Sequence, residues 1–150
     1  MYQRILIPID GSNTAARGLT EGMRLAKDQG AKLRVVHVVN ELMMVAAYEG
    51  AIYSGELVDA LRESGRTLLL KAEEQVKAAG LQVETALLEA HGGQAGDAIA
   101  KDAELWKADI IVLGTHGRRG LGRLVMGSDA EQVLRQAKVP VLMVRNFSAT

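Results

Sequence analysis

The residues of this chain that are best suited to chemistry form a glycine-rich run from Gly114 to Ser128. An apolar run precedes it at residues 110–113, and a helical pattern follows it from about Ser128. Three arginines lie inside the run, and no acidic residue does. Glycine lets the main chain approach a ligand closely, and the free N–H groups at the start of a helix favour an anion. The pattern therefore predicts a phosphate-binding loop between a strand and a helix.

Two well-known phosphate-binding motifs do not describe this run. Gly117 and Gly122 have the spacing of a Walker A element, but Arg123 and Leu124 occupy the places of its lysine and hydroxyl residue. A dinucleotide fingerprint would need a third glycine where Val125 stands. General rules thus indicate an anion-binding loop and nothing more specific.

Short apolar runs alternate with amphipathic helical patterns along the rest of the chain. This alternation predicts an α/β fold with a parallel, doubly wound sheet. In such a sheet the carboxyl ends of the strands share one edge, so Asp10, Val38, His91 and Gly114 could meet in one crevice. We expect strands at residues 2–9, 33–39, 81–88, 109–113 and 139–144, and helices at 14–29, 55–79, 94–106 and 128–136.

Local signals support several of these boundaries. Ser12 or Asn13 can cap the first helix, Gly30 can end it, and Gly18 with Gly22 can let it pack closely on the sheet. The connection at residues 40–54 is unusually apolar. We interpret it as packing over the sheet edge; a lid or partner surface is the alternative.

Composition excludes several classes of protein. The chain has 150 residues, which predicts one domain over residues 1–150. Its formal net charge is zero, which gives no reason to expect nucleic acid as a partner. It has no cysteine, and no apolar stretch approaches the ~20 residues that span a bilayer. Because the first residues also lack a signal-peptide pattern, we expect a cytoplasmic protein that binds no membrane.

The spacing Gly114-x2-Gly117-x9-Gly127-Ser128 resembles the nucleotide-binding signature of the universal stress protein family. Residues 5–12, 36–38 and 140–144 are also similar to the first, second and last strands of that family. The resemblance covers essentially the whole chain. It implies a single-domain, five-stranded parallel sheet of order 3-2-1-4-5 with helices on both faces, and it places the chain among the ATP-binding members.

The resemblance also implies a binding site for ATP with Mg²⁺. Asp10 would lie near the ribose or phosphates, Pro8 would shape that wall, and the main chain of Val38 would meet the adenine edge. The glycine-rich run would hold the phosphates through Gly114, Gly117, Gly127 and Ser128. To these positions we add Arg118, whose guanidinium suits phosphate oxygens, and His116 as a hydrogen-bond donor near the nucleotide.

One residue departs from the family pattern. Asp129 follows Ser128 directly, where many members have a small or apolar residue. A carboxylate in the first turn of a helix suits the helix dipole, but it would repel a nearby phosphate unless it turns outward or shares a magnesium ion.

The resemblance further implies a homodimer through the last strand, from Val139 to Val144, because an apolar edge strand needs a partner. We expect a nucleotide-binding stress-response or signalling module. No catalytic set is recognisable, so at most slow ATP hydrolysis is expected. The alternatives are a weak ATP hydrolase or phosphotransferase, and a structural dimer that binds no nucleotide.

The three histidines and the single tryptophan have simpler interpretations. His37, His91 and His116 could gather with Asp10 around a metal, but they lack the local spacing of metal ligands, so we predict no metal site. Trp106 ends an amphipathic helix and is expected in the core or at its rim.

Overall fold

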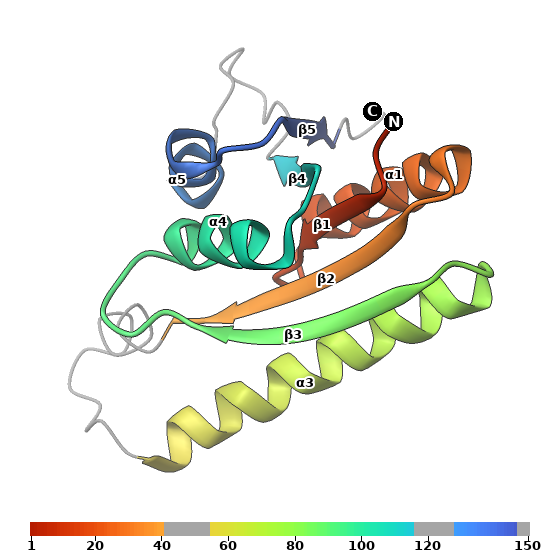
Figure 1. The fold of residues 1–150 in the computed structure, drawn as a ribbon. Helices are drawn as coiled ribbons and strands as arrows, with labels where there is room; N and C mark the ends of the chain where they lie inside the picture. The colour runs from red at the N-terminus through yellow and green to blue at the C-terminus, as the bar shows by residue number, and fades with distance from the viewer. Residues whose placement is uncertain (41–54, 116–127, 147–150) are drawn as a thin grey trace.

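The computed structural model describes residues 1–40, 55–115 and 128–146, and all the strands of these parts form one parallel sheet (Figure 1). The strand order is β3-β2-β1-β4-β5, as predicted. The chain forms its elements in this order: β1 (Arg4–Pro8), α1 (Asn13–Gln29), β2 (Lys32–Val39), α3 (Gly55–Ala78), β3 (Val83–Glu89), α4 (Ala95–Trp106), β4 (Ile110–Thr115), α5 (Ser128–Gln136) and β5 (Val141–Arg145).

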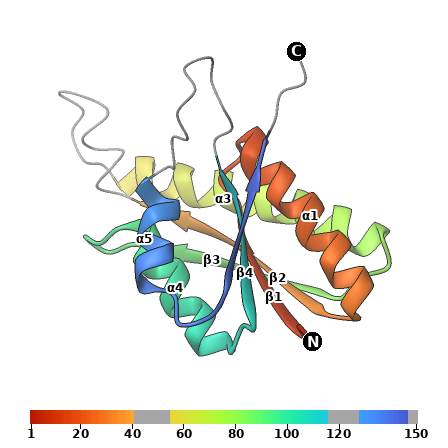
Figure 2. The same ribbon diagram turned by 90° about the horizontal axis from the view of Figure 1, so that it is seen from above.

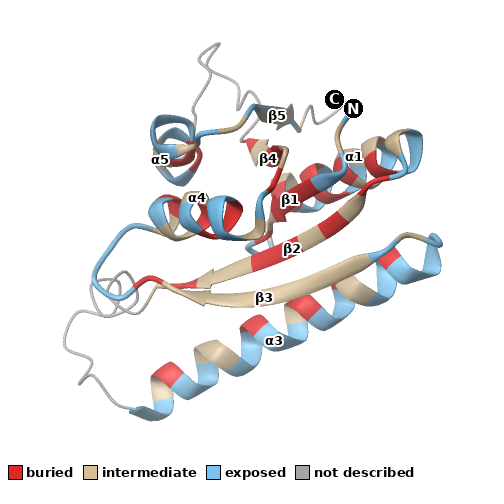
Figure 3. Ribbon diagram, in the orientation of Figure 1, coloured by how far each residue is buried: buried red, intermediate tan, exposed pale blue. Residues whose placement is uncertain are grey.

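Helices cover both faces of the sheet, because successive strand residues point to opposite sides. Ile5 and Ile7 of β1 belong to a core cluster with residues of α1 and α3. Leu6 belongs to a second cluster with residues of α4 and α5. Figure 2 shows the two helix pairs on either side of the strands, and Figure 3 shows the buried residues on the inner faces of the helices. Each fully buried Ile or Leu contributes roughly 1.5–3 kcal/mol.

Helix α1 begins and ends where its sequence signals predict. The Ser12 Oγ accepts a hydrogen bond from the Ala15 N–H at 3.1 Å, which caps the first turn. Gly30 ends the helix in a left-handed conformation with φ 67°. A Cβ on Gly22 would stand 2.2 Å from the Ile7 Cδ1, so glycine lets α1 lie this close to the sheet without displacing that side chain.

Every strand differs from its predicted bounds by one or two residues at one end or both. Strand β4 continues through Gly114 to Thr115, because β5 runs beside it and pairs with both residues. Strand β5 begins at Val141 rather than Val139, since Pro140 has no N–H to donate; its carbonyl still accepts from Ile111. Strand β1 begins only at Arg4.

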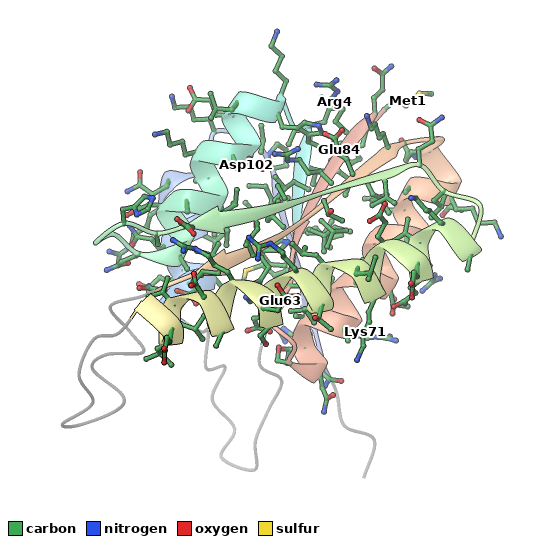
Figure 4. The ribbon with its side chains drawn as sticks, turned by 90° about the horizontal axis from the view of Figure 1, so that it is seen from below. Met1, Arg4, Glu63, Lys71, Glu84 and Asp102 are labelled. Carbon is green, nitrogen blue, oxygen red and sulfur yellow. The ribbon has the colours of Figure 1, made fainter. Side chains whose placement is uncertain are left out.

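The amino-terminal ends of the strands carry a cluster of paired charges on the side of the sheet covered by α4. The Arg34 guanidinium donates to both carboxylate oxygens of Asp102, at 2.8 and 2.9 Å, and to Glu84 at 3.1 Å. The guanidinium groups of Arg4 and Arg34 lie over the Trp106 ring, 5.3 and 5.9 Å from its centroid. Figure 4 labels Arg4, Glu84 and Asp102, which come from β1, β3 and α4. Trp106 thus lies at the rim of the core, partly buried beneath two cations.

The apolar connection at residues 41–54 lies outside the described residues, so its predicted packing over the sheet edge stays a prediction. Within the described parts of the chain, no helix has the length and apolar character needed to cross a membrane.

Candidate functional site

A cavity of about 250 Å³ opens where β1 and β4 end. These neighbouring strands continue to opposite sides of the sheet, so the cavity lies at the switch in strand order, where ligands of open α/β sheets bind. It is lined by residues of β1 and the turn after it, α1, β2, α4, β4 and α5: Pro8, Ile9, Asp10, Ser12, Thr14, Ala15, His37, Val38, Ala95, Ile99, Leu113, Gly114, Thr115, Asp129 and Ala130.

Asp10 is held in place by the turn that follows β1. Its Oδ1 accepts a hydrogen bond from the Ser12 N–H at 2.9 Å, the usual bond of an Asx turn. The Ser12 hydroxyl lies 2.9 Å from that of Thr14 and also caps α1. The Asp10 carboxylate is therefore fixed at the mouth of the cavity, with its second oxygen left to accept a hydrogen bond from a ligand hydroxyl.

The main-chain hydrogen bonds of β2 show that the main chain of Val38 faces the cavity. The Val36 carbonyl accepts from the Ile9 N–H at 2.8 Å, so Val36 faces β1, whereas the Val39 carbonyl accepts from Ala90 on the β3 side. Alternate residues of a strand present their main-chain groups to the same neighbour. The N–H and C=O of Val38 therefore point toward the β1 side of β2, beyond Pro8, the last residue of β1. A planar ring placed there could accept a hydrogen bond from the N–H and donate one to the C=O.

Gly114 brings β4 into direct contact with α1. A Cβ at this position would stand 1.8 Å from the Thr14 carbonyl oxygen and 2.8 Å from the Ala15 nitrogen. The reciprocal contact is similar, since a Cβ on Gly18 would stand 2.7 Å from the Gly114 nitrogen. The packing of the fold therefore requires Gly114 whether or not a ligand is bound.

His37 lines the cavity, and its ring already forms a hydrogen bond within the protein. Its Nδ1 lies 2.8 Å from the Ile9 carbonyl, and because a carbonyl can only accept, this nitrogen carries the proton. His91 is 75% exposed and lies beside Glu89, away from His37. Among the described residues no three His, Asp or Glu side chains gather in a way that could hold a metal ion. His116 lies outside the described residues.

Asp129 gives the cavity a second carboxyl group. Partial burial raises the pKa of this carboxyl, and the negative charge of Asp10 raises it further. Both causes mean that the ionised form is disfavoured where it stands. No lysine or arginine occurs among the described residues that line the cavity. The described wall is therefore negative, although the sequence predicts an anion site here.

The structure brings four of the nine predicted site residues together. Pro8, Asp10, Val38 and Gly114 line one cavity, and Ser128 begins α5 beside it. The other four lie outside the described residues, so their roles stay predictions: His116, Gly117, Arg118 and Gly127.

Sequence reasoning missed most of the wall contributed by α4. Ala95 and Ile99 line the cavity because α4 packs across the face of the sheet. Such residues have no chemical signature, and only the amphipathic pattern of α4 could have shown which of its faces turns inward. Thr115 was missed because its strand was expected to end earlier.

The sequence and the fold have clear relatives. A model of the universal stress protein family matches residues 1–145, so the chain belongs to this family. The universal stress protein MJ0531 of Methanocaldococcus jannaschii is 34% identical over 97% of this chain and 83% of its own length.

Solved structures of the family share this architecture. A protein of the universal stress protein family from Burkholderia pseudomallei superposes with a TM-score of 0.76 at 33% identity, covering 95% of this chain and 96% of its own. A universal stress protein solved in complex with cAMP has a TM-score of 0.64 at 25% identity, covering 96% and 97% of the two chains.

Proposed function

We propose that this universal stress protein binds ATP in the cavity at the carboxyl edge of the sheet and acts as a stress-response or signalling module. The observation that carries the proposal is the position of the cavity at the strand switch, between a fixed carboxylate and free main-chain groups. The related structure in complex with cAMP supports a nucleotide as the class of ligand.

Each part of the nucleotide has a suitable partner in this arrangement. The Val38 N–H and C=O can meet the edge of adenine, and Asp10 can accept from the ribose hydroxyls. The phosphates would approach the start of α5 at Ser128, together with Gly117, Arg118 and Gly127 of the glycine-rich run. Asp10 supplies an oxygen ligand of the kind that Mg²⁺ prefers.

Isothermal titration of the full chain with ATP and MgCl₂ tests this proposal. Ala95→Trp should abolish binding, because the indole would fill the cavity from the first turn of α4. Lys101→Trp places the same bulk on an exposed position of the same helix, outside the cavity, and should bind as the unaltered protein does. Equal binding by both variants would place the ligand elsewhere.

The glycine-rich run provides a second test. Gly117→Val or Gly127→Val should remove ATP binding while the protein stays folded, because the added side chain blocks the phosphate path. Mass spectrometry of the natively purified protein would identify any nucleotide it carries. Turnover well above background that Asp10→Ala abolishes would favour the alternative of a hydrolase or phosphotransferase.

We further propose a homodimer through β5. Among the described residues β5 pairs with β4 on one side only, and its Leu142 is 41% exposed. Antiparallel pairing of two copies across a twofold axis would cover this edge.

Sedimentation of one variant and its control tests the dimer. Leu142→Glu should shift the protein to monomers, because each new charge would meet its own copy across the axis. Leu105→Glu alters a leucine on α4 that is 73% exposed and should leave the dimer intact. A dimer that survives Leu142→Glu would contradict pairing through β5.

A further inference from the structure

The described wall of the cavity carries two carboxyl groups, those of Asp10 and Asp129. Asp10 is tied to the Ser12 N–H at 2.9 Å, and Asp129 stands in the first turn of α5 among the residues that line the cavity. The remaining described lining residues are apolar or uncharged apart from His37, whose Nδ1 proton is directed at the Ile9 carbonyl. A ligand entering here meets carboxylates on two sides.

The start of α5 already has an anion beside it. A helix N-terminus carries roughly half a positive charge, which attracts phosphate and carboxylate alike. Asp129 and Glu131 both lie in this first turn. Glu131 is paired with Arg135 at 2.7 Å and does not line the cavity, whereas no described residue forms an ion pair with Asp129. A phosphate at this helix end would therefore face the Asp129 carboxylate directly.

We propose that Asp129 sets the charge preference of the cavity by weakening the binding of every phosphate group that approaches the start of α5. The inference rests on the nucleotide-binding function proposed above, and it concerns the phosphate groups of that ligand. A phosphate that comes close to the Asp129 carboxylate is bound more weakly than it would be beside an uncharged side chain, whereas the adenosine portion is unaffected.

The effect of burial on Asp129 supports this proposal independently of any ligand. Its pKa is raised by partial burial and by Asp10, so the cavity already opposes one negative charge at this place. A further negative charge from a phosphate meets the same desolvation and the same neighbours. The effect on the affinity for a phosphate-bearing ligand is large enough to measure, because the repulsion between two unit charges at close range changes a binding equilibrium about fivefold even in bulk water.

Isothermal titration of the full chain with adenosine, AMP and ATP, in buffer without divalent cations, tests the proposal. Asp129→Asn keeps the size of the side chain and removes its charge. It should tighten ATP binding by at least about fivefold and leave adenosine binding unchanged. The control Glu131→Gln removes the same charge from the same helix turn outside the cavity, and it should change neither ligand's affinity.

The outcomes separate this inference from the proposed function. If Asp129→Asn tightens ATP and adenosine equally, or neither of them, Asp129 does not set the charge preference although the cavity binds nucleotides. If no adenine compound binds to the unaltered protein or to either variant, the nucleotide-binding function itself fails. Asp129→Ala, which suits a helix and also removes the charge, repeats the test should the asparagine variant fold poorly.

Discussion

The amino-terminal end of the sheet and the cavity at its carboxyl end hold their charges in opposite ways. At the amino-terminal end, Asp102 receives two hydrogen bonds from Arg34, and the Asp109 Oδ2 receives the main-chain N–H groups of Gln3 and Arg4, both at 2.8 Å. At the carboxyl end, Asp10 and Asp129 stand on a cavity whose described wall holds no lysine or arginine.

This difference separates charges that hold the fold together from charges that remain available to a ligand. A buried carboxylate is stable only when it is hydrogen-bonded and paired, as Asp102 is. A carboxylate left beside a cavity lowers stability, and a raised pKa such as that of Asp129 is its signature. The contrast therefore assigns structure to one end and recognition to the other.

Gly114→Ala should have the largest effect on stability, because it forces α1 and β4 apart at the carboxyl end of the sheet. The new Cβ would meet the Thr14 carbonyl at 1.8 Å, and main-chain atoms cannot yield as a flexible side chain does. We expect the free energy of unfolding in urea to fall by about 3 kcal/mol. Gly55→Ala, where the added Cβ would meet no atom of the described residues within 4 Å beyond its own helix, is the control and should be nearly neutral. A mild effect of Gly114→Ala would show that the strand end can shift.

Arg34→Met should have the next largest effect, at the opposite end of the sheet. It leaves Asp102, whose side chain is only 10% exposed, without its partner. We expect a loss of about 2–3 kcal/mol in the same unfolding measurement, below the upper range for buried pairs because Arg34 itself is 19% exposed. Arg24→Met removes an exposed arginine paired with Glu21 and should change stability by less than about 0.5 kcal/mol. Equal losses would erase the distinction between the two ends.

Asp129→Asn should have the smallest effect and the opposite sign. The pKa of Asp129 is raised above its ordinary value of 3.8, so the folded chain keeps this proton at a pH where the unfolded chain has released it. The carboxyl therefore lowers stability as the pH rises from 3.8 through its folded pKa, and the loss is complete above that value.

Melting temperatures of the two proteins across this pH range reveal that sign. The Tm of Asp129→Asn minus that of the unaltered protein should grow as the pH rises above 3.8 and then level off. Asp10 and His37, which line the same cavity, are present in both proteins. A flat difference would mean that the Asp129 carboxyl is as well solvated in the folded chain as in the unfolded one.

Local signals made the fold predictable. The bounds of α5 agree with the prediction, and Ser12 with Gly30 marks the ends of α1 to within a residue. Both kinds of signal depend on residues that are close in sequence. The ends of β4 and β5 were misjudged because pairing between Gly114 and Val144 depends on residues far apart in the chain.

The site was predictable where chemistry and main-chain geometry coincide. Asp10 and Val38 follow from their places at the ends of apolar strands. The pair of Arg34 with Asp102 joins residues 68 positions apart, and nothing near either residue in the sequence announces it. The packing role of Gly114 was likewise hidden, since a glycine that ends a strand looks the same whether a ligand or a helix approaches it.

The direct contact between α1 and β4 has a mechanical consequence. Where main chain touches main chain at Gly18 and Gly114, no layer of side chains is left to absorb a shift. The α1 and β4 sides of the cavity therefore move as one rigid body. On the other side, α4 also lies close to α5, because a Cβ on Gly96 would stand 2.9 Å from the Asp129 carbonyl oxygen and 2.5 Å from the Gln132 Cβ. The Gln132 Nε2 donates to Asp97 at 2.7 Å across the same contact. Glycine contacts therefore brace both sides of the cavity, and the packing of α5 on α4 sets the position of the turn that carries Asp129.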